Sequence, residues 1–292
     1  MKSPNFGYLR ARSLRHACDV LGEYDGEAVA IAGGQSLLAG LNMRLSSPRL
    51  LVDIGNLPEL SGFHFGADEI VLGALTRHVE VLESVPLRQQ LPLLPQAVSH
   101  VAHAAIRNRG TLGGSLAYAD PAAELPACAV VLDATITVAG SAGEREIKAA
   151  DFFTGLMETA LRPGELIIAV RFPVPAPNTR FAFGEFSRRR GDFAVAGIAA
   201  SAVIGGGNID EARVVYFGCV EHAKIAAQVS AALRGLPLPT TDIEEVLRAV
   251  EHDLDPDDMP GWRASTQLEL AKVITRRALG ELQQTSLPHA AH

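Results

Sequence analysis

Two pairs of adjacent glycines, each followed closely by a serine, are the residues of this sequence best suited to hold a charged ligand. Gly33-Gly34 precedes Ser36 in AIAGGQSLLAG, and Gly113-Gly114 precedes Ser115 in TLGGSLAYADPAAE. Glycine is needed where φ is positive or where another group comes close to the backbone. Unpaired amides between a strand and a helix bind anions, phosphate included. Each pair therefore indicates either a tight turn or a phosphate-binding loop.

The presence of two such loops favours a ligand over two simple turns. Hydroxyl and carboxyl groups accompany the second loop: Thr111, Asp120 and Glu124. The two loops could hold two parts of one elongated anion, such as the pyrophosphate and ribityl parts of a flavin dinucleotide. The sequence lacks the G-x-G-x-x-G fingerprint of a Rossmann unit and the G-x-x-x-x-G-K-[ST] phosphate loop. Leu38 replaces the closing glycine of a nucleophile elbow, which argues against a serine hydrolase.

The other reactive side chains carry weaker signals. His100 and His103 would share a face of an expected helix and could share a metal ion, but no carboxylate has the matching spacing, so an ordinary helix surface is the simpler interpretation. The run from Arg188 to Asp192 indicates a solvated turn or a loop beside a redox ring. No carboxylate pair and no Ser/His/Asp set indicates proton-transfer chemistry. We therefore predict no catalytic and no metal-binding residue, and any chemistry would belong to a cofactor.

Short strands and helices must position these loops. Apolar patterns in the first 57 residues predict a small α/β unit, with a helix over 13–24 capped by Ser13, a strand over 27–34, a helix over 36–45 capped by Ser36 and a strand over 48–60. The next segments predicted are a strand and short helix over 69–84, a longer helix from Pro95 to Asn108, a hairpin that turns at 141–143 and a strand over 164–178.

A proline-rich stretch from Pro173 to Pro177 predicts the main domain boundary. The second half should contain strands over 181–187 and 209–220, followed by helices that begin at two capping boxes, Thr241 with Glu244 and Thr266 with Glu269. The expected division is one domain over 1–177, with subdomains 1–57 and 58–177, then an α+β domain over 178–286 and a tail over 287–292.

The composition excludes several classes of protein. A net charge of −7 over 292 residues argues against a nucleic acid or an anionic membrane as partner. No apolar run is long enough to span a bilayer, and the start of the sequence lacks the apolar segment of a signal peptide, so we expect a cytoplasmic location. Cys18, Cys128 and Cys219 have neither a disulfide spacing nor that of a zinc or iron–sulfur site.

Two stretches together resemble a known family. AGGQSLLAGLNMRLSSPRLLVDIGNLPEL and IRNRGTLGGSLAYADPAAELPA are similar to the two FAD-binding stretches of the medium subunit of molybdenum hydroxylases, a family that includes the flavoprotein subunit of aerobic carbon monoxide dehydrogenase and the FAD domain of xanthine dehydrogenase. The resemblance covers nearly the whole chain. It implies an α+β fold, in which a two-subdomain FAD-binding domain like that of vanillyl-alcohol oxidase precedes a three-stranded antiparallel sheet with a helical bundle.

The resemblance also implies which residues surround a non-covalently bound FAD. The first loop, Ala32, Gly33, Gly34, Gln35, Ser36 and Leu37, would wrap the pyrophosphate. A second clamp would consist of Thr111, Gly113, Gly114 and Ser115. Asp120 would lie in reach of the same region, and Glu124 stands where xanthine dehydrogenase has an aspartate on the ribityl chain. Leu166 would meet the flavin end through its backbone, and Phe193 would lie over the isoalloxazine face.

The function implied by the resemblance is electron transfer within a larger enzyme. A large subunit would carry molybdopterin, a small subunit would pass electrons from two [2Fe–2S] clusters to this FAD, and FAD would give them to an external acceptor: NAD, a quinone, a protein or oxygen. The assembly would be a dimer of heterotrimers. Two alternatives stay open, a free-standing FAD oxidoreductase of the same fold and a non-catalytic nucleotide-binding scaffold subunit. The substrate of the complex stays open as well.

Overall fold

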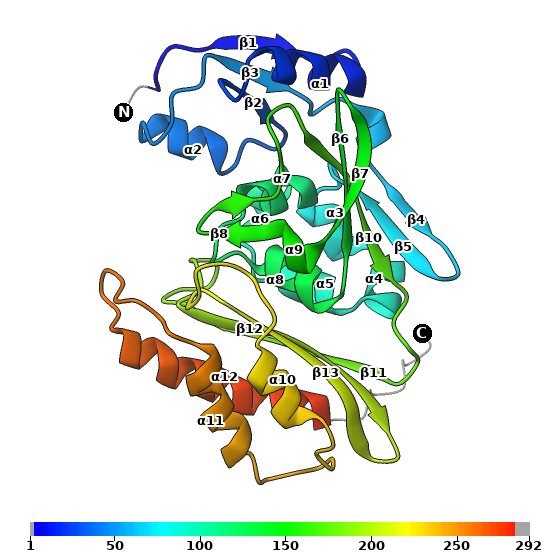
Figure 1. The fold of residues 1–292 in the computed structure, drawn as a ribbon, viewed down its shortest axis with the longest axis vertical. Helices are drawn as coiled ribbons and strands as arrows, with labels where there is room; N and C mark the ends of the chain where they lie inside the picture. The colour runs from blue at the N-terminus through cyan, green and yellow to red at the C-terminus, as the bar shows by residue number, and fades with distance from the viewer. Residues whose placement is uncertain (1–2, 284–292) are drawn as a thin grey trace.

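The computed structural model describes residues 3–283, whose helices and strands form three tiers along the longest axis of the molecule (Figure 1). The predicted tail over 287–292 lies outside the described residues. Each tier contains its own sheet, and the chain visits the tiers in order, from the first at the top of Figure 1 to the third at the bottom.

The first tier is a parallel sheet with strand order β1-β3-β2, which confirms the predicted α/β unit. Its elements are β1 (Gly7–Arg10), α1 (Leu14–Glu23), β2 (Ala28–Ile31), α2 (Leu37–Asn42) and β3 (Leu50–Asp53). The Ser13 hydroxyl accepts a hydrogen bond from the His16 amide, as its predicted role as helix cap requires. Ser36 precedes α2, but its side chain makes no capping bond, so that part of the prediction is wrong.

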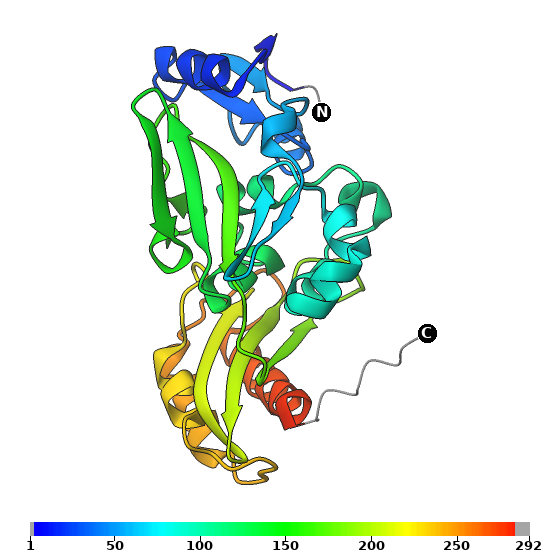
Figure 2. The same ribbon diagram turned by 90° about the vertical axis from the view of Figure 1, so that its right-hand side faces the viewer.

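The second tier is a five-stranded antiparallel sheet with order β4-β5-β10-β6-β7. Its strands are β4 (Phe63–Phe65), β5 (Glu69–Gly73), β6 (Thr135–Gly140), β7 (Gly143–Lys148) and β10 (Leu166–Pro173). The short 3₁₀ helix η1 (Pro58–Leu60) precedes it, and a small hairpin joins β8 (Phe153–Gly155) to β9 (Glu158–Thr159). Figure 2 shows helices of residues 78–98 on one side of this sheet only.

The helices of the second tier are short and are separated by tight turns. They are α3 (His78–Glu83), α4 (Val85–Gln90), α5 (Leu93–Val98), α6 (Ala104–Arg107), α7 (Leu112–Tyr118), α8 (Glu124–Val131) and α9 (Ala149–Phe152). The longer helix predicted from Pro95 to Asn108 is wrong, because the chain leaves the helix after α5 and Ala102 adopts a positive φ of 39°. The Arg107 guanidinium donates to the carbonyls of Val101 and Ala102, which gives the broken segment other hydrogen-bond partners.

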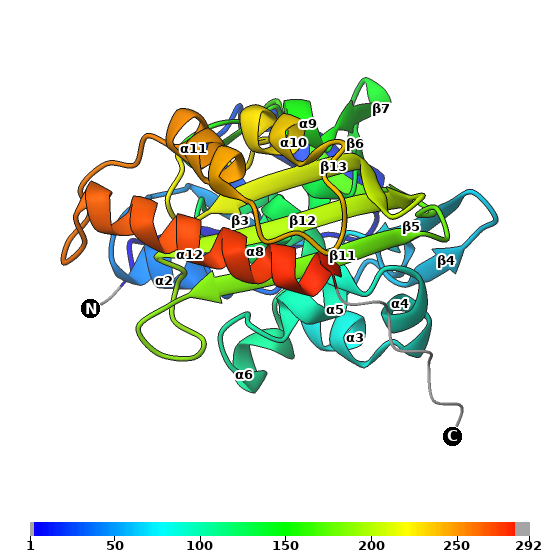
Figure 3. The same cartoon turned by 90° about the horizontal axis from the view of Figure 1, so that it is seen from below.

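The third tier is an antiparallel sheet of β11 (Thr179–Phe186), β12 (Ala196–Gly205) and β13 (Asn208–Phe217). Figure 3 shows α10 (Ala227–Leu233), α11 (Glu244–Asp253) and α12 (Ala264–Gln283) over one face of this sheet. The opposite face packs against α5 and α8 of the second tier, where Phe183 and Phe217 stack with ring centroids 5.5 Å apart. The predicted three-stranded sheet with a helical bundle is therefore confirmed.

Both predicted capping boxes in the third tier are wrong. Ile243 occupies the N-cap of α11 without a side-chain bond, and Thr266 lies inside α12 rather than before it. Asp258, from the preceding loop, accepts the Ala264 amide at 2.8 Å at the start of α12. Over residues 3–283, no helix has the length and apolar character that a membrane span requires.

Candidate functional site

The two glycine loops, far apart in the sequence, lie in direct contact. A Cβ atom built on Gly33 would come within 2.1 Å of the carbonyl oxygen of Arg109 and 3.0 Å of the Cα of Gly110. Gly33 is therefore required by the approach of the second loop. Gly34 has a φ of +73°, so the turn into α2 requires glycine there for its conformation. Packing within the chain explains both glycines of the first pair before any ligand is considered.

The first loop keeps its backbone amides available. Within the described part of the chain, none of the amides of residues 33–36 donates a hydrogen bond to another backbone or side-chain group. The Gln35 side chain donates to the Gly33 carbonyl at 3.0 Å, which braces the turn from its other side. Four consecutive N–H groups at the start of a helix, with the adjacent Ser36 hydroxyl also exposed, form a cradle for an anion.

The second loop is held more tightly, because its amides are already used. The amides of residues 112–115 donate to the carbonyls of Thr76, Ala74 and Thr111 and to the Thr111 hydroxyl, which caps α7. A Cβ on Gly113 would lie 2.6 Å from the Cβ of Ala74, so Gly113 is a packing glycine. A Cβ on Gly114 would meet only the Thr111 hydroxyl, at 2.8 Å. Gly114 therefore marks the open side of this loop, beside the half-buried Ser115.

His78 supports the second loop, a role that the sequence did not indicate. Its Nε2 lies 3.1 Å from the Thr111 carbonyl, and its amide donates to the Gly110 carbonyl at 2.9 Å. Burial, helped by the Arg107 charge, lowers the pKa of this imidazole to about 4, so the ring is neutral at pH 7. Nε2 then carries the proton that it donates to Thr111, and among residues 3–283 the buried Nδ1 has no hydrogen-bond partner.

Acidic side chains gather where the second loop leads into α8. Asp120 Oδ1 accepts the Ala122 amide at 2.9 Å, and burial raises the pKa of this carboxyl. Burial also raises the pKa of Glu124 to about 8, and the charges of Glu185 and Asp120 act in the same direction. Glu185 enters from β11 of the third tier and lies 3.3 Å from Nδ1 of His100. No spacing or motif in the sequence associates Glu185 or His100 with the glycine loops.

Leu166 and Phe193 occupy different surroundings. Leu166 starts β10 opposite Ala139, and its side chain is buried in the core of the first tier. A bulge follows, and the Ile168 carbonyl accepts the Ala74 amide at 3.0 Å, which connects β10 to the strand end that holds Gly113. Phe193 is 72% exposed in the loop between β11 and β12.

The arginine-rich turn before Phe193 packs against the broken helix of the second tier. A Cβ on Gly191 would lie 2.5 Å from the Ala102 carbonyl oxygen. This contact places the Arg188–Asp192 turn beside the segment that contains His100. The prediction of a helix face shared by His100 and His103 is wrong, since His100 lies in the break and His103 is the N-cap residue of α6.

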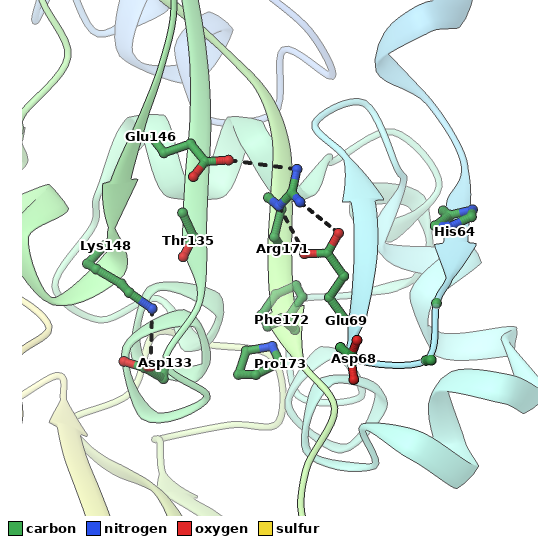
Figure 4. Close-up of a pocket in the computed structure, with 12 residues that line it drawn as sticks. His64, Asp68, Glu69, Asp133, Thr135, Glu146, Lys148, Arg171, Phe172 and Pro173 are labelled. Carbon is green, nitrogen blue, oxygen red and sulfur yellow. Dashed lines mark hydrogen bonds and ion pairs between the residues drawn. The ribbon is translucent and has the colours of Figure 1, made fainter.

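A cavity of about 590 Å³ lies elsewhere, on the polar face of the five-stranded sheet. Figure 4 shows both of its basic side chains paired with carboxylates: Arg171 with Glu69 at 2.7 Å and Glu146 at 3.7 Å, and Lys148 with Asp133 at 3.2 Å. None of the predicted cofactor-binding residues lines it. The contact between the two glycine loops is therefore the better candidate site.

Two family models together match nearly the whole chain. Residues 4–175 match the family described as the FAD binding domain in molybdopterin dehydrogenase, and residues 181–282 match the CO dehydrogenase flavoprotein C-terminal domain. The chain is 37% identical over 289 residues to the alpha subunit of the 6-hydroxypseudooxynicotine dehydrogenase complex of Paenarthrobacter nicotinovorans, with 99% of this chain and 98% of that one covered.

Two solved structures share the fold over nearly the whole chain. A carbon monoxide dehydrogenase from Hydrogenophaga pseudoflava, which lacks the Mo-pyranopterin moiety of its molybdenum cofactor, superposes with a TM-score of 0.93 at 30% identity, covering 97% of this chain and 98% of that one. Quinoline 2-oxidoreductase from Pseudomonas putida 86 superposes with a TM-score of 0.89 at 38% identity, covering 97% and 99%.

Proposed function

This chain belongs to the family of FAD-binding medium subunits of molybdenum hydroxylases, and on that premise we propose that its two glycine loops hold the diphosphate of FAD between them. The family, the fold and the cofactor expected from the sequence are confirmed by the matches. The chain is a flavoprotein oxidoreductase subunit. The matches favour a subunit of a larger enzyme over both alternatives, a free-standing flavin enzyme and a non-catalytic scaffold.

The observation that carries the proposed site is the set of free amides in the first loop. The N–H groups of residues 33–36 have no partner in the described chain, and the backbone of Arg109 and Gly110 lies directly beside them. Diphosphate oxygens need several donors, and this loop offers four with no competing acceptor. Ala32 and Leu37 flank these donors in the chain, and Gln35 keeps the turn in shape.

The second loop offers the ligand side-chain groups and open space beside its backbone, rather than free amides. Ser115 offers a hydroxyl, Gly114 leaves room for close approach, and Thr111 and Gly113 hold the loop in place. Glu124 begins α8 and Asp120 lies in the connection before it, and both would lie in reach of the ribityl hydroxyls. Leu166 would present its backbone to the flavin end, and the exposed Phe193 would cover the ring.

Bound FAD supplies redox chemistry that accepts electrons singly and releases them singly or in pairs. We propose that the electrons come from [2Fe–2S] clusters of a small subunit, that a large subunit carries molybdopterin, and that the assembly is a dimer of heterotrimers with an external acceptor. The subunit and complex names of the relatives support the multi-subunit part of this proposal. The three buried free thiols support a cytoplasmic location.

We also propose the domain division 1–177 and 178–286, with a boundary between subdomains near residue 57. The connection between β10, which ends at Pro173, and β11, which begins at Thr179, supports the first boundary. The change from the parallel sheet of the first tier to the antiparallel sheet of the second supports the other.

The visible spectrum of the purified chain, before and after addition of FAD, tests the cofactor site directly. We expect a flavin spectrum, with the flavin released to the supernatant by acid because it is not covalently bound. A colourless chain that does not bind added FAD would contradict the proposal.

Co-purification of a tagged chain, with molybdenum and iron measured in the eluate, tests the partner subunits. A stable and active metal-free monomer would exclude these partners.

A further inference from the structure

We propose that Arg145 and Glu165 are positioning residues for the cofactor: their ion pair fixes the turn that contacts the first tier, and it thereby holds the two glycine loops at the separation that FAD requires. This inference rests on the proposed FAD site, in which the first loop belongs to the first tier and the second loop to the second tier. A ligand held between the two loops responds to any change in the placement of one tier relative to the other.

Arg145 and Glu165 form a bidentate ion pair within the second tier. The Arg145 Nε donates to one oxygen of the Glu165 carboxylate at 2.8 Å, and Nη2 donates to the other oxygen at 2.7 Å. Nη2 also donates to the Ala160 carbonyl at 2.7 Å, so one guanidinium joins both ends of the segment 160–165. The Glu165 side chain is only 12% exposed, so solvent screens this pair less than a surface pair.

The segment between these two ends forms a turn that its own sequence favours. Gly164 follows Pro163 and has a φ of +83°, as the third position of a type II turn requires. The Glu165 amide donates to the Arg162 carbonyl at 3.0 Å, and the Glu165 carboxylate accepts the Arg162 amide at 2.8 Å. The shape of the turn is therefore set locally, while Arg145 fixes its orientation on the sheet.

The turn contacts the end of α1 in the first tier. A Cβ atom built on Gly164 would lie 3.0 Å from the Cα of Gly22, the last residue but one of α1, so the two backbones touch. One turn earlier on α1, the Cys18 thiol lies 3.5 Å from the Ala139 carbonyl of β6. Leu166, directly after the turn, is buried in the core of the first tier. Figures 1 and 2 both show the β6–β7 hairpin reaching α1.

The strand that follows the turn supports the second glycine loop. The Ile168 carbonyl of β10 accepts the Ala74 amide at 3.0 Å, and the Ala74 carbonyl accepts the Gly113 amide at 2.8 Å. The turn that ends at Glu165 is therefore joined on one side to α1 and on the other side to the second loop by a continuous series of contacts. Its position sets how the first tier lies against that loop.

Loss of the ion pair should change the placement of the tiers rather than their folding, because each tier has its own sheet. FAD binds only those molecules in which both loops are correctly placed, and its apparent dissociation constant rises as that fraction falls. Arg171 and Glu69 offer a comparison within a single tier. They form an ion pair at 2.7 Å between β10 and β5, on the polar face of the same sheet (Figure 4).

The test is the dissociation constant of FAD from the flavin-free full-length chain, measured by flavin fluorescence. We expect it to rise about tenfold in Arg145→Gln and in Glu165→Gln, and no further in the double variant, because either substitution removes the same pair. Arg145→Lys retains the charge without the two parallel bonds and should lie between the wild type and Arg145→Gln. Arg171→Gln is the matched control and should bind FAD as the wild type does.

Spin labels measure the placement of the tiers directly. Arg15 on α1 and Val85 on α4 are exposed and can carry labels after replacement by cysteine, since the three native thiols are buried. In the flavin-free chain, we expect a broader distribution of distances between the two labels in Arg145→Gln than in the wild type or in Arg171→Gln. A pair that contributes only general stability would not produce this difference.

Two results would overturn the proposal while leaving the FAD site intact. One is an FAD affinity of Arg145→Gln that equals that of the wild type or falls no further than that of Arg171→Gln. The other is a distance distribution that Arg145→Gln leaves unchanged. Absence of FAD binding by the wild type would instead refute the proposed function, on which the role of the ion pair depends.

Discussion

Gly33 and Arg109 belong to different tiers, and the carbonyl oxygen of Arg109 occupies the space that a Cβ atom of residue 33 would fill, 2.1 Å from its position. This contact joins the first glycine loop to the second. It also changes the explanation of the first pair, since Gly33 admits a neighbouring backbone and Gly34 provides a positive φ. The amides of residues 33–36, which have no acceptor within the described chain, are the part of the loop that packing leaves for a ligand.

Gly33→Ala should disrupt both the contact and the cofactor site. The added methyl group collides with backbone that has little freedom to move, and we expect a loss of roughly 3 kcal/mol in the free energy of unfolding together with the loss of bound FAD. Urea denaturation of the flavin-free chain and the flavin content per chain measure the two effects. Gly40→Ala is the control, because within residues 3–283 no atom outside the helix's own backbone and the two chain neighbours lies within 4 Å of that Cβ, and alanine should stabilise α2 by roughly 0.5–1 kcal/mol.

The local patterns in the sequence predicted most of the elements because each depends on neighbouring residues. The apolar spacing of α1, its cap at Ser13 and the hairpin of β6 and β7 are examples. The failures arose where distant groups compete with local ones. Arg107 binds the carbonyls of the broken helix, and Asp258 caps α12 in place of Thr266.

The candidate site was predictable in its residue types but not in its construction. Two Gly-Gly-Ser loops are visible in the sequence, yet only the folded chain shows that they touch through Gly33 and Arg109. His78 and Glu185 could not be found from spacing, because each reaches the site from an element whose place depends on tertiary packing. Their signals are a buried imidazole nitrogen and a buried carboxylate oxygen that have no partner in the described part of the chain, and only the folded structure reveals them.

Gly114→Val should remove the cofactor while leaving the chain folded. A Cβ at residue 114 would meet only the Thr111 hydroxyl, so the cost to folding is the loss of a helix cap, about 1 kcal/mol. The side chain would nevertheless fill the open side of the loop. Ser84→Ala removes a comparable cap from α4, whose Leu87 amide it holds at 3.3 Å, and should leave FAD bound. Flavin content of both variants decides the question, and a normal content in Gly114→Val would show that the second loop is only a turn.

Ser36→Ala should weaken FAD binding with little effect on stability, whereas Ser13→Ala should lower stability with little effect on FAD binding. Ser36 makes no capping bond, so its loss should change the free energy of unfolding of the flavin-free chain by less than about 0.5 kcal/mol, but it should weaken FAD binding several-fold if the hydroxyl contacts phosphate. Ser13 caps α1 through the His16 amide, so its loss should cost about 1 kcal/mol without affecting FAD. Thermal melts and FAD titrations of both variants give the comparison, and equal FAD affinity in the two would contradict the assignment of Ser36.

His78 should make the stability of the chain sensitive to acid in a defined pH range. Its pKa is about 4 in the folded protein, against 6.5 as the ordinary value of histidine. Between these values the unfolded chain binds the proton and the folded chain does not, so the free energy of unfolding falls as the pH decreases from 6.5 to 4 and this contribution is fully lost below 4. The difference corresponds to roughly 3 kcal/mol.

His78→Gln isolates this contribution, because glutamine can still donate to the Thr111 carbonyl but does not titrate. Urea denaturation of the flavin-free protein at half-unit steps from pH 7 to pH 4 should show the wild type losing about 3 kcal/mol relative to the variant over this range. His64→Gln, on the exposed face of β4, is the control and should follow the wild type. Parallel curves for the wild type and His78→Gln would mean that His78 is not held neutral behind the second loop.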